Sequence, residues 1–173
     1  LKTFPCPGAE SGNYAIPSNH SLRDHWTDLQ ATERLSVYIN VIDRCLRSEA
    51  FTPEALTHVL ASLYDTVECI RANTYYKEAS NHRQFEVQAV WTAAVLLPEF
   101  AKSVDWESDS IRDISTQSNI QFADDGVQNE MDPSYHISVI SVFNRMHTLA
   151  VLNGKESLLP GDFVSRLHSA CTF

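Results

Sequence analysis

The chain has 173 residues, enough for one domain with a hydrophobic core, and its globular composition excludes a disordered protein. Its net charge of −9 argues against a nucleic-acid-binding protein, which needs a basic face to neutralise phosphates. Any polyanionic substrate would have to be held by a local cluster of cations. No apolar run reaches the length of a membrane span, and the first residue is Leu1 instead of Met, so we expect a piece of a longer protein.

Residues 1–24 hold three prolines and two glycines and predict an irregular lead-in. The segment 25–173 predicts a helical domain. Its first helix covers about 26–47, and the next one begins with a Thr52 N-cap before Pro53 and runs to about residue 71. The apolar stripes of these two helices are Leu35, Tyr38, Ile42 and Leu46, and then Leu56, Leu60, Leu63, Val67 and Ile70.

Four more helices follow in the sequence. The third, about 82–97, is apolar over most of its length, which predicts that other helices surround it until Pro98 ends it. No segment shows the alternation of a strand, so the predicted class is all-α, with antiparallel helix hairpins. The remaining predicted helices are about 107–121, from Asp132-Pro133 to near Gly154, and about 161–171.

The cysteines and histidines show no pattern of metal ligands. Cys45 and Cys69 lie within helical patterns, which predicts that they are small buried apolar residues. The sequence neither supports nor excludes a disulfide. The cysteines therefore do not fix the redox compartment. A metal site is the least favoured interpretation, because the histidines have no recognisable ligand spacing. They are His58, His82, His136 and His147.

Asn81 and His82 stand where the loop after residue 77 meets the apolar third helix. In the structural interpretation, Asn81 or Ser80 is only an N-cap that accepts a backbone N–H. In the functional interpretation, His82 handles a proton and Glu86, one turn further along the same face, orients its imidazole. The spacing alone leaves both interpretations open.

Tyr135 and His136 fall in the first turn of the helix that Asp132 and Pro133 begin. In the structural interpretation, Tyr135 is an amphipathic side chain that only fills space at the helix start. In the functional interpretation, it is a phenol whose negative form the helix N-terminus would stabilise. His136 fits either a second polar side of the same site or a capped surface residue. Three cations, Arg34, Lys77 and Arg83, could bind acidic sugar groups or could belong to solvated helix faces.

Together, these elements carry a family resemblance. The stretch NHRQFEVQAVWTAAVLLPEF, followed by DG, Glu130 and PSYH, resembles the N-terminal helical domain of the heparinase II/III family of polysaccharide lyases. The likeness covers roughly residues 26–150 and is strongest over 80–100 and 125–140. The order and separation of the NH and YH elements fit the family. A second NH at Asn19-His20 lies in a proline-flanked loop and is discounted.

The resemblance implies β-elimination at a uronic acid of a heparan-like or alginate-like glycan. Asn81 would neutralise the carboxylate, His82 would be a candidate base, and Tyr135 would be the acid or a combined base and acid. Supporting or substrate-binding roles would fall to the remaining polar residues of the two elements and to the cations. These are Glu86, Glu130, His136, Arg34 and Arg83.

The resemblance also implies an architecture. The family joins an α/α toroid to a C-terminal β-sandwich domain, so this chain is expected to be part of a toroid that works with a β-sandwich partner domain of the same protein. No cofactor is expected in this chain, and a structural divalent metal would belong to the β-sandwich. The expected location is periplasmic or secreted. The alternative from another functional class is a non-catalytic glycan-binding or helical interaction domain on the same scaffold.

Overall fold

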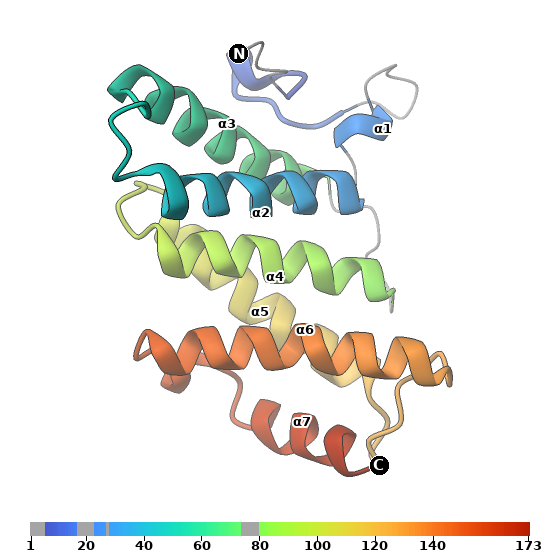
Figure 1. Cartoon of the computed structure of the whole chain (residues 1–173). Helices are drawn as coiled ribbons and strands as arrows, with labels where there is room; N and C mark the ends of the chain where they lie inside the picture. Colours follow the sequence, from blue (N-terminus) through green and yellow to red (C-terminus); the bar gives the residue numbers. More distant parts are fainter. Residues whose placement is uncertain (1–5, 17–22, 27, 74–79) are drawn as a thin grey trace. The chain divides into compact units, whose positions relative to one another are not determined.

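A computed structural model describes residues 6–16, 23–26, 28–73 and 80–173, and the chain divides into two compact units. The units are Leu1–Tyr75 and Tyr76–Phe173, and each is described by itself. Helices dominate both units (Figure 1), and the described residues contain no strand, only an isolated bridge between Phe122 and Gln128. The prediction of an all-α chain is confirmed. Among the described helices, none has the length and apolar character required to span a bilayer.

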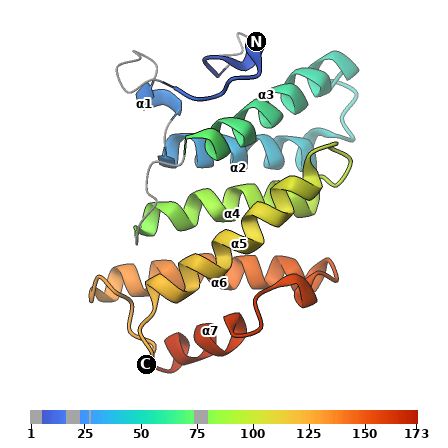
Figure 2. The ribbon, with the colours of Figure 1, turned by 180° about the vertical axis from the view of Figure 1, so that it is seen from behind.

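The first unit is built on an antiparallel hairpin of two long helices, which lie side by side in Figures 1 and 2. The predicted cap is present, because the Thr52 hydroxyl accepts a hydrogen bond from the N–H of Ala55 at 3.3 Å. Both predicted helices are confirmed to within a few residues. The elements are η1 (Ala9–Ser11), α1 (Arg23–Trp26), α2 (Asp28–Cys45) and α3 (Pro53–Ala72).

The described part of the lead-in packs against α3. The Tyr14 hydroxyl donates to Asp65 Oδ1 at 2.9 Å, and Asn73 at the end of α3 accepts from the N–H of Ile16 at 2.7 Å. These bonds give the segment a fixed place in the first unit although it has almost no regular structure. Its short helices η1 and α1 lie where the sequence predicted an irregular chain. A small buried cluster fills the contact: Cys6, Ile16, Trp26 and Cys69.

The second unit is organised around α4, which packs against both α5 and α6. The Trp91 indole in the middle of α4 donates to the carbonyl of Met146 on α6 at 3.2 Å. Nine residues of α4 are buried, which agrees with the prediction that other helices surround this helix. The elements are α4 (Asn81–Leu96), α5 (Ser103–Gln121), α6 (Pro133–Leu152), η2 (Glu156–Leu158) and α7 (Phe163–Thr172).

The largest difference from the predicted helices is the start of α5, which begins at Ser103 instead of about residue 107. The buried face of α5 explains the difference, because polar side chains occupy much of it and apolar periodicity does not reveal them. The Ser103 hydroxyl also donates to the carbonyl of Pro98 at 3.1 Å, which fixes the turn after α4. The buried residues of α5 are Ser103, Trp106, Ser110, Ile114, Gln117, Ser118 and Gln121.

Candidate functional site

The beginning of α4 shows which residue is the N-cap, a role that the sequence left open between Ser80 and Asn81. Ser80 is the N-cap, and its hydroxyl accepts a hydrogen bond from the N–H of His82 at 3.2 Å. Asn81 is the first helical residue and is half-buried, and its side-chain amide makes no hydrogen bond to any described residue. An amide has two donors and an acceptor. The capping role therefore belongs to Ser80 and not to Asn81.

Arg83 ties the first turn of α4 to α5. Its guanidinium binds the Glu86 carboxylate at 2.7 Å and the Asp113 carboxylate of α5 at 2.5 Å. The Arg83 side chain is only 12% exposed, so the interpretation of Arg83 as part of a solvated helix face is wrong. The clamp lies one residue from His82 and two from Asn81, and it restrains the backbone from which both side chains extend.

Glu86 binds Arg83, a partner that the sequence did not suggest. Its side chain is 1% exposed and binds Arg83, its neighbour three residues earlier. A buried carboxylate needs such a partner, because an unpaired charge in the interior is costly. The contact between Glu86 and Arg83 therefore stabilises the first turn of α4.

The beginning of α6 holds Tyr135 near solvent. The Asp132 carboxylate caps the helix and accepts from the N–H groups of Ser134 at 2.7 Å and of Tyr135 at 3.2 Å. This confirms the predicted helix start at Asp132 and Pro133. The Tyr135 side chain is 45% exposed, and its hydroxyl makes no hydrogen bond to any described residue. The Tyr135 phenol is therefore open to solvent.

His136 uses both ring nitrogens within the protein. Nδ1 accepts from the N–H of Gln128 at 3.3 Å, and Nε2 lies 3.0 Å from the carbonyl oxygen of Ala170. The ring also lies near Phe122 and Phe173, with centroid distances of 6.4 and 5.8 Å. In this arrangement His136 has no nitrogen left for a substrate.

Three further predicted residues have less to do with the helix starts. Glu130 is exposed in the loop before α6, and its N–H donates to Gln128 Oε1 at 2.9 Å. Arg34 belongs to the first unit, where it lies 4.2 Å from the Trp26 ring centroid and donates to the carbonyl of His25 at 2.8 Å. Lys77 lies outside the described residues.

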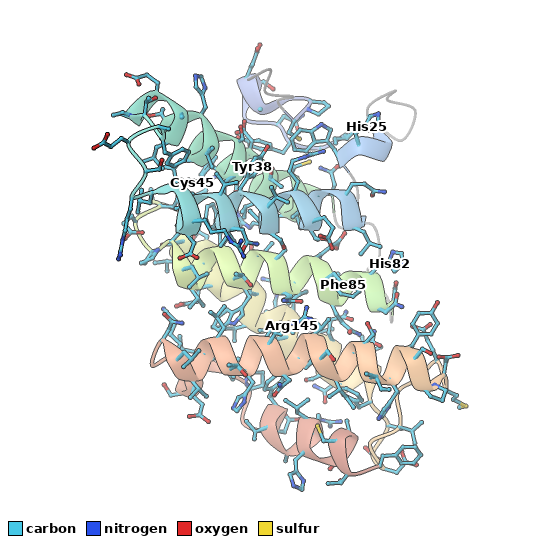
Figure 3. All side chains as sticks on the ribbon, viewed as in Figure 1. His25, Tyr38, Cys45, His82, Phe85 and Arg145 are labelled. Carbon is cyan, nitrogen blue, oxygen red and sulfur yellow. The ribbon has the colours of Figure 1, made fainter. Side chains whose placement is uncertain are left out.

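The structure brings the NH and YH elements to the same end of a pair of neighbouring helices. Helices α4 and α6 run side by side in the same direction, so both begin at one end of the pair (Figures 1 and 2). Figure 3 labels His82 at this end of α4. The sequence did not identify Asp113 or Gln128 as contributors, because Asp113 contacts α4 from α5 and Gln128 contacts α6 from the preceding loop. Among the described residues, no group of three or more acidic, His or Cys side chains is arranged to hold a metal ion.

Comparisons with known proteins give the family of this helical domain. The chain belongs to the heparinase II/III family: residues 9–173 match its N-terminal domain, described as "Heparinase II/III N-terminus". A heparin-sulfate lyase of Bacteroides stercoris is 29% identical over the whole chain, and that of Pedobacter heparinus is 30% identical over 83% of it. The chain spans 27% and 22% of these relatives' lengths.

Solved structures give the same result. A crystal structure of heparinase III matches 92% of this chain and 24% of its own, with a TM-score of 0.81 and 27% identity. A crystal structure of a heparan sulfate lyase from Pedobacter heparinus matches 95% of this chain and 25% of its own, with a TM-score of 0.75 and 27% identity. The prediction that the chain is part of an α/α toroid is confirmed by these matches.

Proposed function

We propose that the protein containing this chain is a polysaccharide lyase that cleaves a glycosaminoglycan of the heparan sulfate class by β-elimination at a uronic acid. The observation that carries the proposal is the placement of Asn81 and Tyr135. Both lie in the first turns of adjacent helices that begin at the same end, and neither polar side-chain group is bonded to a described residue. The heparin-sulfate lyases among the relatives support the substrate class over alginate.

The reaction explains the need for an amide. Removal of the proton from C5 of a uronate places a second negative charge next to the carboxylate, which opposes the reaction unless that charge is offset. The Asn81 side chain can donate hydrogen bonds to the carboxylate and stabilise the charge that develops in the transition state. The start of α4 adds the partial positive charge of its free N–H groups.

The reaction also needs a base at C5 and an acid at the departing O4. His82 is the candidate base, and Tyr135 serves as the acid or as base and acid in turn. The Tyr135 side chain is 45% exposed at the start of α6, so the phenol is open to solvent. Glu86 supports the site through Arg83, and Glu130 lies in the loop that leads to Tyr135.

The rest of the site belongs to other parts of the whole protein. The chain matches about a quarter of its relatives' length. We place the C-terminal β-sandwich domain that the family resemblance implies in the remainder of the protein. We place the whole protein in the periplasm or outside the cell, where it would encounter polysaccharide substrates. In the helical domain, we assign no cofactor to the reaction.

The direct test is the reaction of the whole protein with a panel of heparan sulfate, heparin, chondroitin sulfate and alginate. We expect the ultraviolet absorbance of the unsaturated uronate product to rise with the heparan-type substrates. Replacing Asn81 by Ala or Tyr135 by Phe should abolish this rise while the circular dichroism spectrum stays unchanged. Asn119, an exposed residue on α5 whose amide donates to the carbonyl of Ser115, gives the matched control Asn119→Ala.

Three results would contradict all or part of the proposal. Absence of an unsaturated product across the whole panel would exclude the lyase function. Glycan binding without product, unaffected by Asn81→Ala, would identify the non-catalytic alternative. Product from alginate alone would keep the reaction type and replace the substrate class.

A further inference from the structure

We propose that His136 is a positioning residue for Tyr135, and that its imidazole fixes the start of α6 to the preceding loop and to the end of α7. The inference rests on the proposed function, because the position of Tyr135 affects the rate only if its phenol transfers a proton. It replaces the role in substrate binding that the sequence suggested for His136.

No hydrogen bond to a described residue fixes the direction of the Tyr135 phenol. The Tyr135 side chain is half-exposed. Tyr135 is also the third residue of α6, where backbone N–H groups have no partner within the helix. The direction of the phenol therefore depends on how the backbone of this first turn is held.

His136 holds this turn through two hydrogen bonds: one ring nitrogen donates and the other accepts. The carbonyl of Ala170, 3.0 Å from Nε2, can only accept, so Nε2 carries the proton. Nδ1 then has a free lone pair and accepts from the N–H of Gln128 at 3.3 Å. One ring therefore connects α6 both to the loop directly before it and to α7.

The loop that His136 binds is itself fixed from the side of α5. The Gln128 side-chain amide donates to Gln121 Oε1 at 3.0 Å, and the Gln121 amide donates to Gln117 Oε1 at 3.4 Å. All three glutamines are buried, where unpaired amides would be costly. A continuous line of hydrogen-bonding groups therefore leads from α5 through the loop to the imidazole of His136.

This arrangement predicts an effect on the chemical step and not on binding of the ground state. Since neither ring nitrogen is available to the glycan, loss of the imidazole should leave KM nearly unchanged. Displacement of the phenol by about 1 Å is enough to reduce the rate by up to about 100-fold. The signature of a positioning residue is therefore a fall in kcat at constant KM.

The test compares three variants of the whole protein acting on heparan sulfate. His136→Phe keeps a ring between Phe122 and Phe173 but removes both hydrogen bonds, and we expect kcat to fall by about 10- to 100-fold. His136→Asn retains an acceptor near the position of Nδ1, and His136→Gln retains a donor near that of Nε2. Both should recover part of kcat. Amide hydrogen exchange should accelerate over residues 123–131 in His136→Phe and less in the other two.

Each outcome decides the inference. Wild-type kcat in His136→Phe overturns it, and so does a raised KM at unchanged kcat, which would identify a substrate-binding residue. If His136→Phe does not fold, the same kcat-against-KM comparison on His136→Asn and His136→Gln decides. Tyr135→Phe is measured in parallel. An active Tyr135→Phe enzyme would remove Tyr135 from the mechanism and overturn this inference with it, whereas absence of product in the wild type would refute the proposed function. An inactive Tyr135→Phe beside a fully active His136→Phe would refute only the positioning role.

Discussion

The Arg83 guanidinium on α4 binds the Asp113 carboxylate on α5 at 2.5 Å and joins two helices directly beside the candidate catalytic residues. Glu86 binds the same guanidinium at 2.7 Å, so two carboxylates surround one largely buried cation. Removing one member of such a group leaves the others incompletely paired. Mutations of Asp113 should therefore affect both stability and the position of the first turn of α4.

Asp113→Asn should lower the free energy of unfolding by about 1–3 kcal/mol, between the values typical of exposed and buried ion pairs, because Asp113 is partly exposed. Urea denaturation of the whole protein measures the change. Asp162, the residue before α7, pairs with Arg166 of α7 at 2.8 Å and is 50% exposed, so Asp162→Asn provides a control with a much smaller expected loss. Equal losses in both variants would show that the Arg83 clamp has no special contribution.

Gly126→Ala should destabilise the loop before α6. A Cβ atom at Gly126 would lie 2.6 Å from the carbonyl oxygen of Ser169, and the residue has a φ of +93°. The unfavourable backbone conformation alone costs about 1–3 kcal/mol, and the contact with the backbone of α7 adds to it. Thermal unfolding is the measurement. Gly161→Ala, where a Cβ atom would meet nothing within 4 Å, should be nearly neutral, and equal destabilisation in the two variants would contradict this packing.

Cys69 should resist alkylation in the native protein. A hydrogen bond with Cys6 and burial both raise the pKa of the Cys69 thiol, and the thiolate is the reactive form. Cys171 is exposed and should react first with iodoacetamide. Mass spectrometry of peptides from native and denatured samples gives the order of labelling. Labelling of Cys69 as fast as Cys171 in native protein would contradict the buried cluster.

Tyr14 should make the first unit sensitive to alkaline pH. Burial and the hydrogen bond to Asp65 raise the pKa of the Tyr14 phenol. The folded state therefore keeps this proton at pH values where the unfolded chain loses it, and stability falls as pH rises above about 10. We expect Tyr14→Phe to reduce this alkaline loss, measured by urea denaturation from neutral pH upward. An identical alkaline profile in the two proteins would exclude Tyr14 as its source.

The local signals in the sequence predicted most of the helices. Thr52 and Asp132 are caps whose effect depends on a few neighbouring residues, and Pro98 follows the end of α4 as expected. The start of α5 was less predictable, because Ser110 and Gln117 occupy its buried face and interrupt the apolar pattern. Short-range chemistry is readable from the sequence, whereas a polar residue gains a buried partner only in the folded chain.

The sequence by itself determined the helical class, the helix starts and the presence of an NH and a YH element, because each depends on residues within one or two turns. Only the tertiary structure decided which side chains at those starts remain free. Asn81 and Tyr135 keep unbonded polar groups among the described residues, whereas Arg83 and His136 are held by Asp113 and by Gln128 and Ala170. The physical reason is that a hydrogen-bond partner on another helix is set by packing and cannot be read from neighbouring residues.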